Sequence, residues 1–272
     1  MGLKSSDEWI VKATDLIMLE HFKAADQGFI VKVRDWINQV YDKQQIKVTQ
    51  FLNPHEQDVL KSFVNRQQGL KVFFVGGFLN AERQRAIIFP NQMNPKNLDK
   101  KVNGFQIIYH QKLMLPSHRQ ILGSLMALKI ERSVIGDIVV LNDSELYFAV
   151  CDEFSSFMIE NFTKVGRDSV FLEQTNLQRL EKNDRYEELE IIVSSMRLDV
   201  VVASLINASR SIVFDLMNQG FVQLNHLVTK NHSLACHTGD LISIKGYGRF
   251  KLMAQKKITK KQKLVIVVGK AI

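Results

Sequence analysis

The stretch RLDVVVASLINASRSIVFDLMNQGFVQLN, residues 197–225, decides the fold of the last third of the chain. Apolar residues recur in it at the 3.6-residue spacing of a helix: Leu198, Val201, Val202 and Leu205. Ser209 or Ser211 is the cap of a second helix, which Gly220 ends. Residues 221–225 then alternate as a strand, and residues 241–244 alternate again after a turn. The predicted order is helix, helix, hairpin.

The positive charge of the chain is concentrated around this stretch. Residues 191–272 hold 12 Lys and Arg against three acidic residues, a net charge of +9, whereas residues 1–190 hold 24 against 25. No acidic residue follows Asp240. This asymmetry is typical of proteins that bind a polyanion, because each Lys or Arg near a phosphate releases condensed counterions. A basic segment that only keeps the protein in solution is the alternative.

Length and composition set the broad class. A chain of 272 residues, 46% hydrophobic and 24% charged, is expected to form two or three globular domains. It contains no apolar run of about 18 residues and no signal-peptide pattern, so we expect a cytoplasmic protein without a membrane partner. The two cysteines, Cys151 and Cys236, are far apart and indicate neither a disulfide framework nor a cysteine zinc site.

The rest of the chain predicts an α+β, multidomain architecture. Residues 1–70 are expected to form a helical N-terminal domain, with a helical apolar stripe over residues 9–20 and a second helix that begins at Pro54 after the cap Asn53. Residues 71–178 alternate between strand and helix patterns in an order that includes β-α-β-β-α-β, as in ferredoxin-like and RRM-like domains. Residues 179–190 are expected to be a polar linker, and residues 191–272 the basic domain.

The middle domain carries no decisive motif. An RRM binds RNA through the aromatic residues of its RNP1 strand, and residues 145–150 match that motif only in having aromatic residues. RNA binding by this domain is therefore left open. Gly76-Gly77 is not followed by the Gly-Lys-Ser or Gly-Lys-Thr of a phosphate-binding loop, so a tight turn between strands is expected there.

The motifs of the C-terminal third resemble the S4 RNA-binding domain. The resemblance is carried by Arg197-Leu-Asp199, Ser209-Arg210, Gly220-Phe-Val-Gln-Leu-Asn225 and Gly239-Asp240-Leu-Ile-Ser243. Over nearly the whole chain, further motifs resemble the YlmH-type S4 proteins of Gram-positive bacteria: Gly76-Gly77-Phe, residues 81–86, His118-Arg119, Gly136-Asp137, Gly166-Arg167 and residues 246–250. This resemblance implies a non-catalytic protein that binds rRNA of the large ribosomal subunit, tRNA or both. It also implies a role in ribosome-associated quality control of obstructed nascent chains, alongside other quality-control factors.

The same resemblance implies which residues contact RNA. The expected RNA face comprises Arg197, Ser209, Arg210, Ser211, Asn225, Lys230, Lys245 and Arg249. Further RNA or phosphate contacts are expected at Arg83, Arg85, His118, Arg119, Lys256 and Lys257. Arg210 is the strongest candidate, because the N-terminus of a helix presents free N–H groups and a positive dipole to a phosphate. Arg197 has an alternative role as an ion-pair partner of Asp199 or Asp215. For residues 256–263 the alternative is a loop that only keeps the protein in solution. Lys245 stands where arginine is common in the family, and lysine lacks arginine's bidentate fork.

Two other function classes stay open. S4 domains accompany pseudouridine synthases, whose catalytic aspartate lies in an Arg-Leu-Asp run, but here Asp199 continues into an apolar helix instead of a glycine-bearing loop. A protein scaffold that uses the S4 domain only for docking is the third class. His226, His232, Cys236 and His237 match no standard zinc spacing, so no metal, cofactor or catalytic residue is predicted. A monomer is expected.

Overall fold

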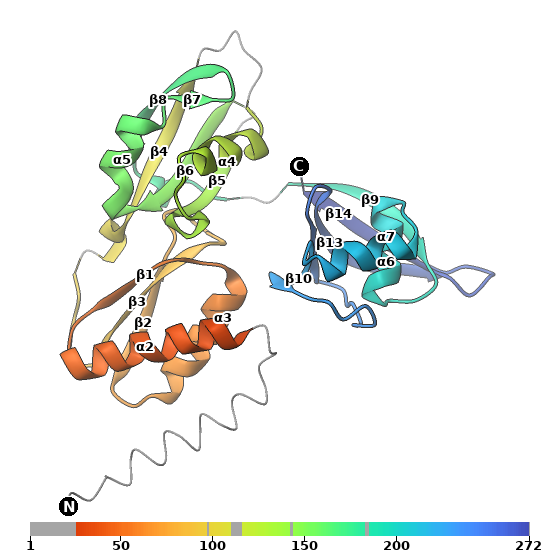
Figure 1. Ribbon diagram of the computed structural model, residues 1–272, viewed down its shortest axis with the longest axis horizontal. Coiled ribbons are helices and arrows are strands. Elements are labelled where there is room, and N and C mark those ends of the chain that lie inside the picture. Colours follow the sequence, from red (N-terminus) through yellow and green to blue (C-terminus); the bar gives the residue numbers. More distant parts are fainter. Residues whose placement is uncertain (1–25, 97, 110–115, 142–143, 183–184, 272) are drawn as a thin grey trace, which may run out of the picture. The chain divides into compact units, whose positions relative to one another are not determined.

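The computed structural model describes residues 26–96, 98–109, 116–141, 144–182 and 185–271. These residues form α-helices and antiparallel sheets that belong to two compact bodies (Figure 1). The N-terminal body spans Ile30–Asn183 and the C-terminal body spans Asp184–Ile272. The α+β class predicted from the sequence is confirmed.

The N-terminal body begins with a three-stranded sheet. Its order is β1-β3-β2, from β1 (Lys47–Leu52), β3 (Gln84–Pro90) and β2 (Leu70–Val75). Two helices complete this part, α2 (Gln27–Lys43) and α3 (Pro54–Arg66). The predicted helix start at Pro54 is confirmed, with Asn53 and Glu56 forming a reciprocal capping box. The apolar stripe expected over residues 9–20 lies outside the described residues.

The boundary expected at residue 70 falls inside this sheet. Strand β3 pairs with β1 on one side and with β2 on the other, so residues on both sides of position 70 belong to one folded unit. The region is therefore mixed α and β instead of all helical. Strand β1 was missed because it lies between two helices, in a segment that was assigned as a whole to a helical domain.

A five-stranded antiparallel sheet forms the rest of the N-terminal body. Its order is β5-β6-β4-β8-β7, from β5 (Ile135–Leu141), β6 (Glu145–Cys151), β4 (Val102–Tyr109), β8 (Asp168–Thr175) and β7 (Lys164–Val165). Helices α4 (His118–Ala127) and α5 (Ser155–Asn161) follow β4 and β6 in the chain. The predicted β-α-β-β-α-β order is present, and β7 adds a short hairpin strand to it. Short 3-10 turns lie at Leu98–Lys101, Arg132–Val134, Asp152–Phe154 and Leu177–Arg179.

The C-terminal body packs two short helices on a six-stranded sheet. Helices α6 (Leu198–Ile206) and α7 (Arg210–Asn218) lie where the sequence predicts them. The sheet order is β11-β10-β12-β13-β14-β9, from β11 (Leu227–Val228), β10 (Val222–Leu224), β12 (Leu241–Ile244), β13 (Gly248–Ile258), β14 (Leu264–Ala271) and β9 (Tyr186–Val193). Buried residues of both helices and of the sheet form a single apolar core.

Two segments expected to be irregular are strands. The predicted linker, residues 179–190, contains most of β9, which pairs along its whole length with β14. Its glutamates are exposed while Ile191 and Val193 are buried, so an edge strand with one polar face was mistaken for a solvated linker. Lys256 and Lys257 likewise belong to β13 and not to a loop.

Candidate nucleic-acid interface

The α6–α7 corner brings together three of the predicted RNA-face residues. Asn207 ends α6 in the left-handed conformation, with φ of 50°, and the two helices meet at a bend of 110°. Ser209 then caps α7, its Oγ accepting a hydrogen bond from the Ile212 N–H at 3.5 Å. Arg210 is the first helical residue of α7 and is exposed, as is Ser211 beside it. The side chain of Arg210 is thus presented at the helix end that favours anions.

Arg197 sits at the start of α6 and is paired within the protein. Its Nε and Nη2 donate to Oδ1 and Oδ2 of Asp199 at 3.0 and 3.1 Å. The carboxylate is 1% exposed, whereas the arginine side chain is 46% exposed. Burial alone would raise the pKa of Asp199, but the hydrogen bonds and charge of Arg197, the Val200 N–H and the charge of Arg210 hold that pKa below its ordinary value.

This pairing bears on the enzyme alternative. Both oxygens of Asp199 accept hydrogen bonds from Arg197, and the side chain is buried at the start of a helix. A catalytic aspartate must reach a substrate, and this carboxylate, 1% exposed, has almost no surface at which to meet one. Asp199 therefore holds the arginine in place and orders the start of α6.

Asn225 has a structural role in the turn after β10. Its φ is 50°, a conformation that asparagine tolerates better than most residues. Its Nδ2 donates to Oδ1 of Asp240 at 2.8 Å, and its Oδ1 accepts from the Leu241 N–H at 2.9 Å. Both ends of the amide are engaged inside the protein, so the side chain joins the end of β10 to the start of β12.

The remaining predicted residues of the RNA face lie on or beside the strands. Lys245, in the turn between β12 and β13, places its Nζ 4.2 Å from the ring centroid of Phe221. Arg249 is on β13 opposite Ser243, and Lys230 is exposed after β11. Lys245 and Lys230 are exposed, while Arg249 is half-buried.

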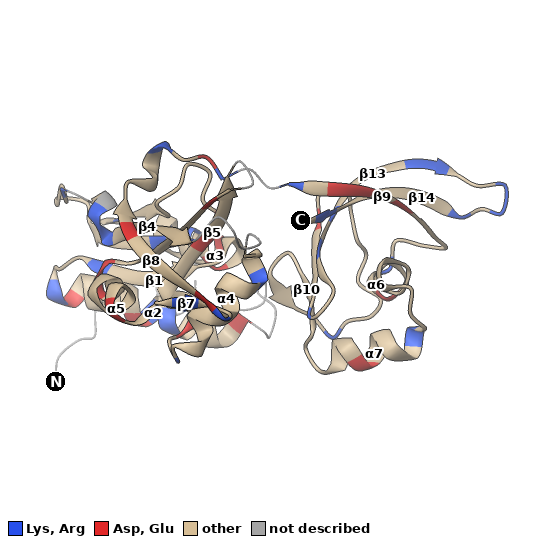
Figure 2. Ribbon diagram, turned by 90° about the horizontal axis from the view of Figure 1, so that it is seen from above, with Lys and Arg blue, Asp and Glu red and all other residues tan. Residues whose placement is uncertain are grey.

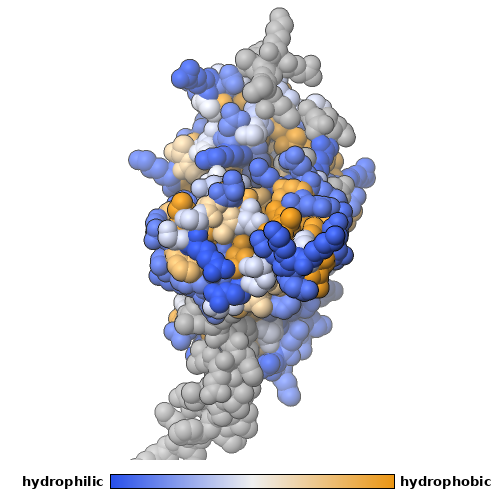
Figure 3. Space-filling view, turned by 90° about the vertical axis from the view of Figure 1, so that its right-hand side faces the viewer, coloured by the Kyte–Doolittle hydropathy of each residue, from blue (hydrophilic) through white to orange (hydrophobic). Residues whose placement is uncertain are grey.

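The β13–β14 hairpin adds a second basic surface to the C-terminal body. Figure 2 shows basic residues on the hairpin and the glutamates of β9 near them. The hairpin lysines are Lys256, Lys257, Lys260, Lys261 and Lys263. Lys256 is hydrogen-bonded to Glu190, a contact that raises the pKa of the lysine and lowers that of the carboxylate. Strongly hydrophilic residues surround small hydrophobic areas on the face of this body that is turned to the viewer in Figure 3. The hairpin was only partly predicted, since only Lys256 and Lys257 were selected from it.

Arg85 is a correction to the predicted phosphate contacts. It is 1% exposed, and its guanidinium donates to Asp152 at 2.7 Å and to Glu153 at 2.7 and 2.8 Å. Its Nε also donates to the Thr49 carbonyl at 2.6 Å. The group is therefore enclosed by acceptors of the N-terminal body and has no path to an external phosphate.

The other three candidates of the N-terminal body differ from one another. Arg83 donates to the carbonyl oxygens of Phe51 at 3.0 Å and Ile135 at 3.3 Å, which ties the two sheets together. His118 and Arg119 are exposed in the first turn of α4, after the Ser117 cap. Arg119 therefore lies at an accessible helix start.

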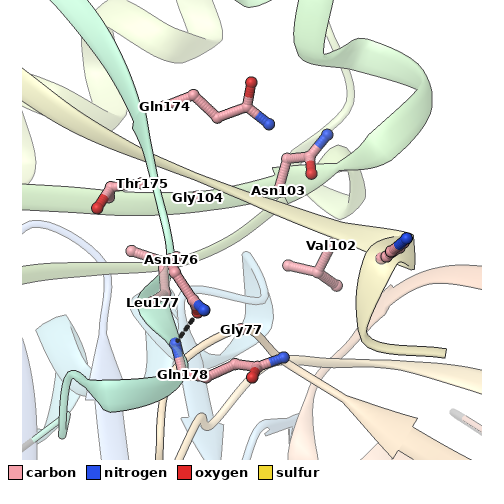
Figure 4. Close-up of a pocket in the computed structure, with 10 residues that line it drawn as sticks. Gly77, Val102, Asn103, Gly104, Gln174, Thr175, Asn176, Leu177 and Gln178 are labelled. Atoms are coloured by element: carbon pink, nitrogen blue, oxygen red, sulfur yellow. Dashed lines mark hydrogen bonds between the residues drawn. The ribbon is translucent and has the colours of Figure 1, made fainter. Parts of the chain in front are cut away.

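A polar pocket in the N-terminal body was not predicted. Its volume is about 350 Å³, and Figure 4 shows the amide side chains that line it. The lining residues are Gly77, Lys100, Val102, Asn103, Gly104, Gln174, Thr175, Asn176, Leu177 and Gln178. The Asn176 Oδ1 accepts from the Gln178 N–H at 2.9 Å, which shapes one wall. The sequence signal for it is the set of amide residues at the end of β8 and just after it, Gln174, Asn176 and Gln178.

The described residues contain no group of three or more His, Cys, Asp and Glu side chains placed to hold a metal ion. Burial raises the pKa of both Cys151 and Cys236 to about 12, so these thiols are weak nucleophiles. Within the same described part of the chain, no single helix is long and apolar enough to cross a membrane. The bent α6–α7 pair passes that test only when both helices are counted together.

Two family models match the N-terminal body. Residues 25–93 match "YlmH, N-terminal", and residues 95–179 match "Putative RNA-binding domain in YlmH". The chain is also 34% identical over 247 residues to "Ribosome-associated protein quality control protein P2" of Bacillus subtilis (strain 168), which covers 90% of this chain and 95% of that protein. The chain belongs to the YlmH family. The resemblance noted from the sequence motifs is confirmed.

A solved structure of the YlmH family agrees in fold. "Cell division protein ylmH from Streptococcus pneumoniae" is 30% identical, with a TM-score of 0.50, and the match covers 57% of this chain and 93% of that one. The first YlmH model contains the three-stranded sheet and the second contains the five-stranded sheet. The boundary between the two family models, at residues 93–95, thus lies in the segment that separates the three-stranded sheet from the five-stranded sheet.

Proposed function

We propose that this YlmH protein is a non-catalytic RNA-binding factor that associates with the ribosome. The C-terminal body, read as an S4 domain, binds structured RNA of the large subunit, tRNA or both, and the five-stranded sheet is a ferredoxin-like module. The printed names of the Bacillus relative and of the second family model support ribosome association and RNA binding. The corresponding cellular role is ribosome-associated quality control of obstructed nascent chains. The protein would act in the cytoplasm as a monomer.

One observation carries this proposal. Arg210 is exposed at the capped N-terminus of α7, in a body whose net charge is strongly positive. Backbone N–H groups and the helix dipole favour a phosphate at that end, and Arg210 adds a planar guanidinium that donates two hydrogen bonds to it. Arg197, held by Asp199, lies at the start of the neighbouring helix and supplies further positive potential.

Sedimentation with purified large ribosomal subunits at moderate salt tests the proposal. The wild type is expected to travel with the subunit, and Arg210→Glu to remain at the top of the gradient. Lys61→Glu is the matched control, because it makes the same charge change at an exposed position of α3. Arg210→Gln is the second variant, since a new carboxylate near Asp199 could disturb the fold. An Arg210→Gln protein that sediments like the wild type would contradict the proposed site.

A further inference from the structure

One face of the five-stranded sheet leaves apolar side chains of β4 and β8 exposed, although Tyr147 and Val139 on the same face are buried. Along β4 and β8, Phe105, Ile107 and Val170 are buried in a core to which residues of α4 and α5 also belong. Successive side chains of a strand point to opposite faces, so Ile108 and Phe171 point away from that core. Their exposed fractions are 38% and 70%. An aromatic side chain that exposed, in the middle of a regular strand, is not explained by packing.

Three residues of this face are placed side by side by the strand register. Ile108 and Phe171 are direct partners across β4 and β8, so their side chains are neighbours. Ser169 lies two residues before Phe171 and therefore on the same face, and its partner across β7 is Lys164. Lys164 is exposed. Ile108, Lys164 and Phe171 thus form one small surface, here named the Phe171 platform.

We propose that the Phe171 platform stacks one unpaired base of a bound RNA. The ring of Phe171 takes the base, Ile108 supports its edge, and Lys164 contacts the adjoining phosphate. Stacking on an aromatic ring tolerates any base, because every base has a π-face. This inference rests on the proposed RNA-binding function and assigns a second RNA contact to it, outside the C-terminal body.

Size and charge favour a base over a protein partner. A stable protein interface buries about 800 Å² on each side, whereas this platform offers two apolar side chains. The charges beside the platform also differ: Lys164 of β7 lies opposite Ser169 near the start of β8, and Glu173 lies near the end of β8. A nucleotide fits this arrangement with its phosphate toward β7 and its base over the ring.

The test compares single-stranded and paired RNA. The probe is a fluorescein-labelled RNA of about ten nucleotides, used alone and annealed to its complement. Phe171→Ala is expected to weaken binding of the single strand about tenfold, while Phe171→Tyr keeps the ring and the affinity. Phe157→Ala is the matched control, because Phe157 is a partly exposed aromatic residue on α5 instead of on the strand. Binding of the duplex should be the same for all four proteins.

A spectroscopic readout separates stacking from a merely structural effect. The single strand, but not the duplex, should quench the tryptophan fluorescence of Phe171→Trp more than that of the wild type, which already contains Trp9 and Trp36. Unchanged affinity of Phe171→Ala for the single strand, or no binding of that strand by the wild type, overturns the platform. The proposal is also overturned if Phe171→Ala binds the single strand normally but no longer binds the large subunit. In that case the surface around Phe171 contacts protein and not an RNA base. The sedimentation experiment with the Arg210 variants does not depend on Phe171. It therefore tests the proposed RNA-binding function separately from the Phe171 platform.

Discussion

Arg85 and Arg210 show how differently the two bodies use positive charge. Arg85 is enclosed in the N-terminal body, where Asp152, Glu153 and a backbone carbonyl accept its hydrogen bonds. Arg210 is exposed at a helix start in the C-terminal body. Both arginines were candidates for RNA contact on the basis of sequence alone. A basic residue is therefore available to a polyanion only where it is not already enclosed by hydrogen-bond acceptors of the protein.

The same contrast applies to the charge totals. The first 190 residues hold twice as many Lys and Arg as the rest of the chain, but they are balanced by acidic residues. Several of these cations have internal partners, such as Lys182, whose Nζ lies 2.9 Å from the Glu82 carboxylate. In the C-terminal body three acidic residues follow position 190, and one of them, Asp199, is buried against Arg197. The net charge of that segment is therefore carried mainly at its surface.

The largest expected effect is on the stability of the N-terminal body. Arg85→Met removes the buried cation, which leaves Glu153 without this ion pair and Asp152 with only the longer contact to Lys101, and should lower the free energy of unfolding by about 3 kcal/mol. Urea unfolding followed by circular dichroism measures it. Lys71→Met, at an exposed position of β2, is the control and should change little. An equal loss in both variants would remove the structural role given to Arg85.

A smaller loss of stability is expected in the C-terminal body. Asn225→Ala removes the hydrogen bonds to Asp240 and from Leu241 and places alanine at a positive φ, which should cost about 2 kcal/mol. Thermal unfolding of the variant is compared with that of Asn218→Ala, an exposed position at the end of α7. If Asn225→Ala instead weakens ribosome binding at unchanged stability, Asn225 belongs to the RNA face after all.

Acid should weaken the ion pair around Arg85. Burial alone would raise the pKa of Glu153, but the hydrogen bonds and the charge of Arg85 lower it from 4.5 to about 2. The folded pKa is lower than the unfolded one, so this contribution to stability is complete above pH 4.5 and is lost as the pH falls toward 2. The difference in urea midpoint between wild type and Glu153→Gln should therefore shrink over that window. Glu160→Gln, on the exposed part of α5, should show no such trend.

The smallest expected effect on stability comes from the basic hairpin. Lys256 and Glu190 are both about half exposed, and ion pairs of that kind contribute little. Lys256→Gln should keep the melting temperature of the wild type. Its affinity for large subunits should nevertheless fall modestly, because one phosphate contact is lost. A lower melting temperature with unchanged affinity would make Lys256 a structural residue.

Much of the fold was predictable because local signals agreed with it. The caps at Asn53, Ser117 and Ser209 fixed three helix starts, and alternation located most strands. Strands β1 and β9 were missed, since a short strand between helices and an edge strand with a charged face lack a distinctive periodicity. The domain boundary at residue 70 failed for the same reason.

The candidate site was less predictable than the fold. Helix position alone was enough to select Arg210. The burial of Arg85 and the turn geometry of Asn225 depend on partners 67 and 15 residues away, which no local pattern contains. The exposure of Phe171 is equally invisible, because Val170, Phe171 and Leu172 read as one apolar run in the sequence.

The salt dependence of binding to the large ribosomal subunit tests the central claim most directly. The logarithm of the affinity is measured against the logarithm of the salt concentration from about 50 to 200 mM for wild type, Arg210→Gln and Lys61→Gln. If Arg210 contacts a phosphate, its variant should show a slope shallower by about 0.7 to 0.9, with Lys61→Gln unchanged. An affinity of Arg210→Gln that is lower at every salt concentration, with the slope of the wild type, would contradict a phosphate contact at the start of α7.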